Sequence, residues 1–131
     1  MIVRHYTEVA ALPVAMEGAE NVLIRNLITA KDGAPTFAMR IFDVLPGGHT
    51  PLHGHNYEHE ILILDGEGEV TEGKRILALK PGSVVFIRPG TSHQFRNPGE
   101  KVFRFVCLIP NQPTPEVRQV GDPKPANPQC G

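Results

Sequence analysis

Residues 47–66 read Gly47-Gly-His-Thr-Pro-Leu-His53-Gly-His55-Asn-Tyr-Glu-His59-Glu-Ile-Leu-Ile-Leu-Asp-Gly66. Residues i and i+2 of an extended chain share a face, so His53 and His55 can point at one metal ion. His59 follows His55 at an even offset and keeps that face if the backbone stays extended or returns as a neighbouring strand. Neutral imidazole is a general ligand for divalent transition metals. This stretch therefore predicts a metal site built on β structure.

The rest of the chain has the pattern of an all-β protein. Short apolar or alternating runs recur, separated by turn signals such as Pro46-Gly-Gly48 and Pro81-Gly82. This spacing is typical of a sandwich or barrel of antiparallel strands, and no segment has the sustained 3.6-residue apolar period of a helix. The predicted strands cover residues 22–28, 36–45, 59–64, 67–71, 75–79, 84–88, 94–96 and 102–109.

Length and composition limit the interpretation. The chain has 131 residues, which indicates one domain large enough to bury a hydrophobic core. A net charge of −1 gives no electrostatic argument for binding nucleic acid or an anionic membrane. Proline is frequent from residue 110 onward, so we expect a barrel domain over 1–111, with its motif core at 36–109, and an extended Pro-rich tail over 112–131. No apolar run reaches membrane-spanning length, and we expect a cytoplasmic protein.

Alternation along the predicted strands assigns side chains to faces. Along residues 59–64, His59 and Ile61 share one face and Glu60 lies on the other. The last predicted strand, 102–109, is apolar on both faces. Such a strand is either central in a sandwich or covered by another subunit. We therefore expect a homodimer.

Side chains on the inward faces are predicted to line a pocket around the metal. An inward-facing cysteine is more often a packing residue than a nucleophile. Arg40 interrupts an apolar strand, where an unpaired guanidinium would be costly. It either forms an ion pair with Asp43 or Glu60, or it faces the pocket and anchors an anionic substrate. The predicted pocket lining is Arg40, Phe95, Phe105, Cys107 and Ile109.

Three polar residues are candidates for catalytic groups, namely Arg40, His49 and Tyr57. His49 precedes His53 by four residues and is either a base at the rim of the pocket, a residue that supports the ligands, or a histidine in a solvent-facing turn. Tyr57 lies between two predicted ligands and either reaches the mouth of the pocket or only shapes the turn. The sequence leaves these alternatives open.

Two segments of the chain resemble the paired motifs of the cupin family. Residues 47–66 resemble the first motif, G-x5-H-x-H-x3,4-E-x6-G, and residues 82–97, which include His93, resemble the second, G-x5-P-x-G-x2-H-x3-N. The resemblance implies a six- to eight-stranded jelly roll, or double-stranded β-helix, that holds one metal ion inside. Arg88 stands where the second motif has proline, and Pro89 follows one residue late.

His59 occupies the position of the glutamate in the first motif. The longer spacing variant selects Glu60 instead, and only one of the two can be a ligand because they point to opposite faces. The spacing to Gly66 favours His59. This ligand set is similar to that of the small four-histidine manganese cupins, which are homodimeric single-domain proteins, some with oxidative activity. The predicted metal ligands are His53, His55, His59 and His93.

The ligand set predicts one divalent transition metal per subunit, with Mn²⁺ first and Fe²⁺ next. Ni²⁺, Cu²⁺ or Zn²⁺ can replace them in a preparation because these ions bind nitrogen ligands more tightly. The leading hypothesis is a dioxygenase- or peroxide-type oxidoreductase that acts on a small, largely apolar molecule. The alternatives are a Lewis-acid isomerase or lyase acting on a sugar or small acid, and a module that binds a ligand or metal without turnover.

Overall fold

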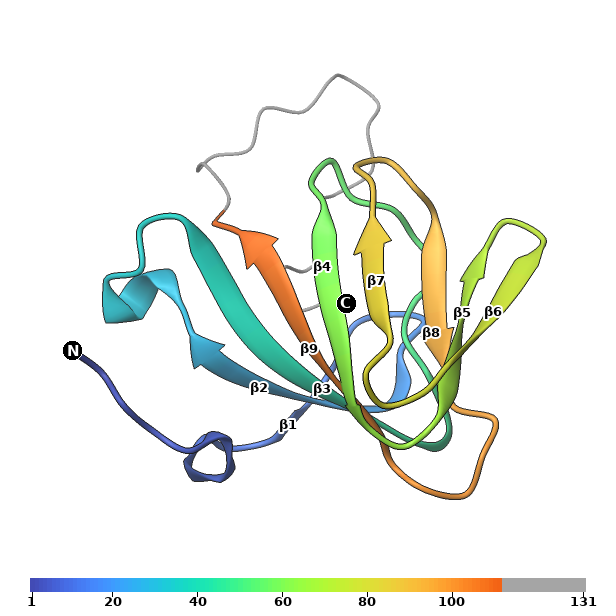
Figure 1. Cartoon of the computed structure of the whole chain (residues 1–131), viewed down its shortest axis with the longest axis horizontal. Coiled ribbons are helices and arrows are strands. Elements are labelled where there is room, and N and C mark those ends of the chain that lie inside the picture. The colour runs from blue at the N-terminus through green and yellow to red at the C-terminus, as the bar shows by residue number, and fades with distance from the viewer. Residues whose placement is uncertain (112–131) are drawn as a thin grey trace.

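The computed structural model describes residues 1–111, which form one curled β-sheet with two single-turn 3₁₀ helices, Tyr6–Glu8 and Ala30–Asp32 (Figure 1). The strands are β1 (Leu12–Pro13), β2 (Glu20–Ile28), β3 (Phe37–His49), β4 (His59–Asp65), β5 (Gly68–Glu72), β6 (Arg75–Leu79), β7 (Val84–Ile87), β8 (His93–Arg96) and β9 (Phe103–Pro110). The predicted all-β class is confirmed. The short strand β1 was not among the strands predicted from the sequence. The expected tail over 112–131 lies outside the described residues. Neither helix within residues 1–111 has the length and apolar character to cross a membrane.

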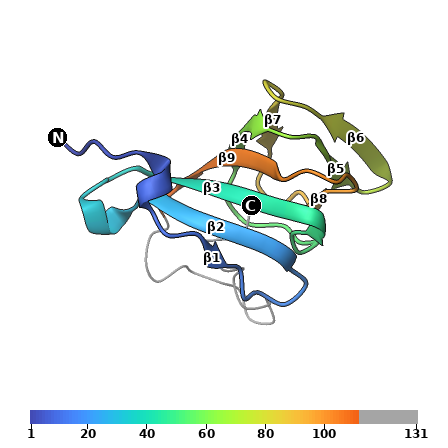
Figure 2. The same cartoon turned by 90° about the horizontal axis from the view of Figure 1, so that it is seen from below.

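Strand β3 joins the two halves of the sheet. The order is β6-β5-β8-β3-β9-β4-β7, with β2 on β3 and β1 on β2, and every pairing is antiparallel. The first part of β3 pairs with β9, from Phe37 opposite Pro110 to Val44 opposite Phe103. Its last residue, His49, pairs with β8. The sheet therefore curls around β3 into the predicted jelly-roll barrel, and Figure 2 shows β3 running beneath β9 toward β8.

The predicted break at residues 46–48 is wrong, because β3 continues through it to His49. Gly47 has a φ of 77°, a conformation that glycine adopts without strain. At Gly48 a Cβ atom would lie 2.6 Å from the carbonyl oxygen of Asn21 on β2, so only glycine fits there. The β2–β3 register also shifts beside this point, between Glu20 and Val22. The glycine pair thus bends the strand from one half of the barrel into the other instead of ending it.

Aromatic side chains fill the interior below the histidines. Phe42, Phe95, Phe103 and Phe105 are fully buried, and the Phe105 ring centroid lies 5.4, 4.7 and 5.3 Å from those of Phe42, Phe95 and Phe103. Every second residue of β9 is buried from Phe103 to Ile109, which confirms the predicted facing. Burying each such ring contributes on the order of 1.5–3 kcal/mol to folding. These four packed rings, called the aromatic floor below, form an apolar layer next to the histidines.

The alternation predicted for β4 is also confirmed. His59, Ile61 and Ile63 are buried, whereas Glu60 and Leu62 are exposed on the outer face. After β4 the chain reverses at Gly66, where a Cβ atom would lie 1.9 Å from the carbonyl oxygen of Val102. The tight reversal therefore requires glycine at the position that closes the first motif.

Candidate metal centre

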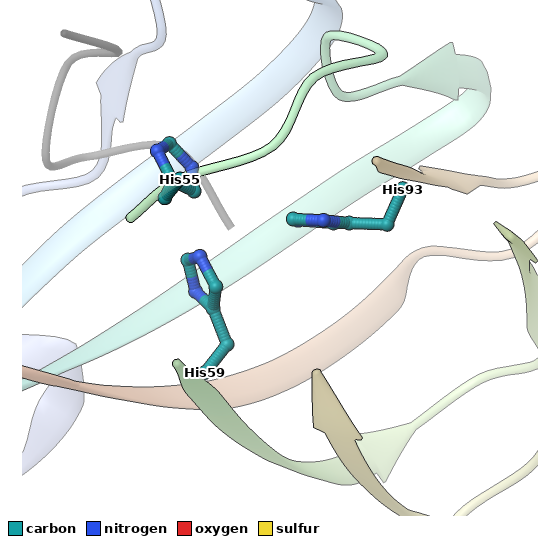
Figure 3. A group of neighbouring side chains, drawn as sticks. All are labelled: His55, His59 and His93. Carbon is teal, nitrogen blue, oxygen red and sulfur yellow. The ribbon is translucent and has the colours of Figure 1, made fainter. Parts of the chain in front are cut away.

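Three histidines from different segments meet inside the barrel. His55 lies between β3 and β4, His59 is the first residue of β4, and His93 is the first residue of β8. One nitrogen atom from each ring lies within 4.8 Å of the others, and Figure 3 shows the three rings facing a common space. The ring centroid of His59 lies 4.8 Å from that of His55 and 5.2 Å from that of His93. This cluster has the donor atoms and the spacing to hold a divalent metal ion.

His53 lies directly beside these three rings. Its Nε2 atom is 2.8 Å from Nε2 of His55. Two nitrogen ligands at right angles, each about 2.1 Å from one ion, would lie about 3 Å apart, so this separation fits a shared ion. The backbone amide of His53 donates to the carbonyl oxygen of His93 at 3.2 Å, and the amide of His93 donates back at 3.0 Å. This two-bond bridge holds the first and last predicted ligands side by side.

Hydrogen bonds at Nδ1 orient the two most buried rings. His93 Nδ1 lies 3.0 Å from the carbonyl oxygen of Thr91, which can only accept, so Nε2 of His93 keeps its lone pair for the cluster. His59 Nδ1 lies 3.4 Å from Sγ of Cys107. His59 Nε2 is buried and has no hydrogen-bond partner among the described residues. A buried polar atom without a partner is costly, and a metal ion would satisfy it, so the residues present fit a bound ion.

Burial keeps these histidines in the neutral form that metals require. Burial, together with repulsion from the other histidines, lowers the pKa of His53 to about 4 and that of His55 to about 3. The same two causes, with a contribution from the Arg40 guanidinium, lower the pKa of His59 to about 2. At neutral pH these three rings therefore offer a lone pair without first losing a proton.

Arg40 faces the barrel interior, beside the histidines. The carboxylate of Asp43 is bound instead by Arg104, at 2.7 and 3.1 Å, and Glu60 is exposed on the outer face of β4. Arg40 is 2% exposed, and its Nη2 atom donates to Sγ of Cys107 at 3.1 Å. Of the two alternatives left open by the sequence, the structure therefore favours the inward-facing one over a pair with Asp43. Burial raises the pKa of the Cys107 thiol despite the opposing effect of Arg40.

Tyr57 and His49 lie in different surroundings. Tyr57 is buried, and its ring stacks on His55 at 4.8 Å between centroids and lies 5.4 Å from the ring of His59. His49 ends β3 and is half-buried, with ring nitrogens 3.4 Å from the carboxylate of Glu20 and 3.4 Å from the side-chain amide of Gln94. Tyr57 thus belongs to the histidine cluster, whereas the ring of His49 is engaged by groups at the end of the strand.

The residues of the predicted pocket lining lie at different depths. The Phe95 ring centroid is 6.0 Å from that of His93, and Arg40 and Cys107 make the contacts given above. Phe105 lies behind Phe95, in the aromatic floor. Ile109 is buried farther along β9, where it also lines a surface groove with Phe37.

Sequence reasoning missed two features that shape the site. One is the polar contact between the Cys107 sulfur and the His59 ring, for which the only signal was that both residues face inward. The other is Gly54, between two predicted ligands, where a Cβ atom would lie 3.1 Å from the carbonyl oxygen of Thr91. The histidine-bearing connection therefore packs its backbone directly on the segment that orients His93.

Comparisons with known proteins identify the fold and the sequence family. Residues 40–109 match the family model of the Cupin_2 cupin domain. The structure is similar to that of the polyketide cyclase RemF from Streptomyces resistomycificus, with a TM-score of 0.83 and 35% identity over 94% of this chain and 89% of that chain. The chain is 36% identical over 74 residues to 1-methylthio-D-xylulose 5-phosphate methylsulfurylase from Rhodospirillum rubrum, covering 56% of this chain and 47% of that protein. It is 37% identical over 65 residues to an oxalate-binding protein from Thermotoga maritima, covering 49% of this chain and 54% of that protein.

The match to the family model covers more than half of the chain. The chain spans about half the length of the two curated relatives, whereas it is nearly coextensive with RemF. Both the family match and the barrel with its inward-facing histidines lead to one assignment. The chain belongs to the cupin family.

Proposed function

We propose that this protein is a metal-dependent enzyme that cyclises a small molecule carrying several carbonyl groups. The observation that carries the proposal is a buried cluster of nitrogen donors inside the barrel, formed by His55, His59 and His93 with His53 beside them. Such a set leaves the full charge of a divalent ion in place, whereas a carboxylate ligand would cancel part of it. The ion, when bound, supplies Lewis-acid polarisation of a carbonyl oxygen.

The likeness to a polyketide cyclase supports this choice of reaction. RemF matches the chain over nearly its whole length, at 35% identity. In such a cyclisation, a methylene carbon between two carbonyl groups loses a proton and attacks another carbonyl carbon of the same molecule. A carbon–carbon bond forms and water leaves, so neither an oxidant nor a reductant is consumed.

Residues of this chain can support each part of that reaction. The Arg40 guanidinium, buried beside the histidines, stabilises negative charge that develops on a carbonyl oxygen. Tyr57, buried against His55, is the candidate for proton transfer. Phe95, fully buried beside His93, keeps that side of the site apolar and free of water.

An oxidative function is the second candidate. If His53, His55, His59 and His93 held Mn²⁺ or Fe²⁺, the ion would supply the redox chemistry that such a reaction needs. The buried Phe95 ring beside His93 gives that side of the site an apolar character, which suits a largely apolar substrate. It ranks second because neutral ligands do not stabilise the trivalent state that oxidation requires.

A metal exchange separates the two candidates. Protein stripped of metal and reloaded with Zn²⁺, Mn²⁺ or Fe²⁺ would be incubated with a synthetic linear poly-β-ketone thioester. Dehydrated cyclic product is followed by mass spectrometry, and dioxygen or peroxide by electrode. We expect the Zn²⁺ form to release the dehydrated product without consuming dioxygen. Turnover restricted to the Mn²⁺ and Fe²⁺ forms, with loss of dioxygen or peroxide, would support the oxidative function instead. An absence of turnover in all three forms would support a binding module.

We further propose that the protein is a homodimer whose subunits meet through the outer face of β4 and β7. Val84 is 77% exposed and Phe86 is 56% exposed on β7, and Leu62 and Leu64 are exposed on β4. Leu62 is the cross-strand partner of Val84, so these side chains form a continuous apolar surface. β7 also ends the strand order of the described sheet. Light scattering at micromolar concentration should give a dimeric mass, and Phe86→Glu should lower it; a monomeric wild type would contradict the proposal.

A further inference from the structure

We propose that Cys107 is a positioning residue for the metal site. Its sulfur accepts a hydrogen bond from Nδ1 of His59 and so keeps Nε2 of His59 available for a metal ion, while Arg40 holds the sulfur in place. The role presupposes the four-histidine metal site proposed above, but the tautomer on which it depends is a property of the metal-free protein.

The pairing of three strands brings these groups together. Cys107 on β9 is the register partner of Arg40 on β3 and of Ile61 on β4. His59 lies two residues before Ile61 on the same inward face, so its ring reaches Cys107 diagonally across the strand pair. The sulfur lies 3.4 Å from Nδ1 of His59 and 3.1 Å from Nη2 of Arg40, and Cys107 is 0% exposed. The sulfur is therefore shielded from water, and its polar contacts are with the His59 ring and the Arg40 guanidinium.

The chemistry of the two neighbours decides which atom donates. A guanidinium can only donate, so the sulfur accepts from Arg40. If the S–H group donated to His59 Nδ1, the ring proton would sit on Nε2, which is buried and has no partner among the described residues. A buried N–H group without an acceptor is rarer in proteins than an acceptor left short of a donor. The contacts therefore favour a proton on Nδ1, donated to the sulfur, and a lone pair on Nε2.

His93 shows the same arrangement with a different acceptor. The carbonyl oxygen of Thr91 accepts from His93 Nδ1 at 3.0 Å. The two most buried histidines of the cluster thus each have an acceptor at Nδ1 and Nε2 directed to the site. Outer partners of this kind fix the ring and the tautomer of metal-binding histidines. A backbone carbonyl cannot be removed by substitution, but the Cys107 sulfur can.

Two substitutions of Cys107 and one control test the role. Cys107→Val removes the acceptor by replacing the thiol with two methyl groups, and Cys107→Ser keeps an acceptor. Ile63→Val is the control, because it removes one buried methylene group from the inward face of β4 without altering a polar contact. The protonated nitrogen of His59 is identified in the metal-free proteins by long-range ¹H–¹⁵N correlation NMR. Zn²⁺ affinity is measured by competition with a chelator.

We expect a proton on Nδ1 of His59 in the wild type, in Cys107→Ser and in Ile63→Val. In Cys107→Val the proton should move wholly or partly to Nε2, and Zn²⁺ affinity should fall by about 10- to 100-fold, as for loss of other partners of metal-binding histidines. Cys107→Ser and Ile63→Val should bind Zn²⁺ close to the wild-type affinity.

Three results would overturn the proposal. An Nε2-protonated His59 in the metal-free wild type would do so even if Cys107→Val failed to fold. An unchanged tautomer and affinity in a folded Cys107→Val would do so as well, and so would equal losses of affinity in the Val and Ser variants. Failure of the wild type to bind Zn²⁺ at all would instead refute the metal site, and the tautomer measurement would still judge the contact between His59 and Cys107.

Discussion

The histidine cluster has two halves that are built in different ways. The strand half consists of His59 and His93, which begin β4 and β8 and are 0% and 1% exposed. The connection half consists of His53 and His55, which lie in the segment between β3 and β4, where His53 is only half-buried. The strand half is fixed by the sheet and by acceptors at Nδ1, and the connection half is tied to it mainly through backbone hydrogen bonds.

This structural difference predicts different roles for the two halves in metal binding. Residues at strand ends hold a precise geometry before an ion arrives, because packing fixes their rotamers. Residues on a connection can adjust to the size of the ion and to an incoming ligand. We therefore expect the strand half to determine whether metal binds, and the connection half to influence how tightly.

Removing a ligand from the strand half should have the largest effect. His59→Ala should lower metal affinity by about 100-fold or more, since it removes one of four donors from a buried site. Glu60→Ala is the matched control, because Glu60 is the next residue but is exposed on the outer face of β4. Metal per chain, measured by plasma mass spectrometry after gel filtration, should be near zero for the first variant and unchanged for the second. Equal losses of metal in the two variants, or a larger loss in Glu60→Ala, would indicate that the Glu60 carboxylate is the ligand instead of His59.

Removing a ligand from the connection half should cost less. His53→Ala should weaken metal binding by about 10-fold, because water can reach the position of a half-buried ring and replace its nitrogen. Chelator competition on His53→Ala and His59→Ala gives the ratio of their metal affinities directly. A larger loss for His53→Ala than for His59→Ala would reverse the ranking of the two halves.

The halves should also differ in their effect on the pH dependence of stability. The ordinary histidine pKa is 6.5, and it falls to about 4 in folded His53 and to about 2 in folded His59. As the pH drops below about 6.5, the unfolded chain takes up protons that the folded, metal-free protein does not, so the free energy of unfolding falls. Denaturant titrations of the metal-free protein at about pH 7 and about pH 5 should show this loss. Between about pH 7 and about pH 5, His59→Gln and His53→Gln should each remove about the same part of this loss, because both folded pKa values lie below about pH 5. The two variants should separate only near about pH 3, where folded His53 takes up a proton and folded His59 largely does not. Equal stability of the wild type at both of the higher pH values would contradict the neutral, buried cluster.

The smallest effect should come from the backbone of the connection. In Gly54→Ala the new Cβ atom would lie 3.1 Å from the Thr91 carbonyl oxygen and 3.2 Å from that of Gly90, so the connection must shift by a few tenths of an ångström. Metal affinity should fall by less than in His53→Ala. Asn56→Ala, an exposed change in the same connection, is the control and should bind as the wild type does. A loss as large as that of His59→Ala would mean that the connection is as rigid as the strands.

The sequence predicted the strands and their faces because period-two alternation and Gly-Pro turns are local signals. It did not predict that β3 would continue past Pro46, because a glycine pair permits either a turn or a bend. Nor did it place Arg40 against Cys107, since that contact depends on the register between β3 and β9, which are far apart in sequence. Two inward-facing residues are predictable from alternation, but which of them touch is decided by strand pairing.

The central claim is that one divalent ion is held by both halves of the cluster. Diffraction from crystals of the metal-loaded protein at the absorption edge of the ion tests it most directly. We predict one anomalous peak per chain, about 2.0–2.2 Å from one nitrogen atom of each of four histidines, namely His53, His55, His59 and His93. A peak held by the strand half and Glu60, or the absence of a peak among these rings, would contradict the account.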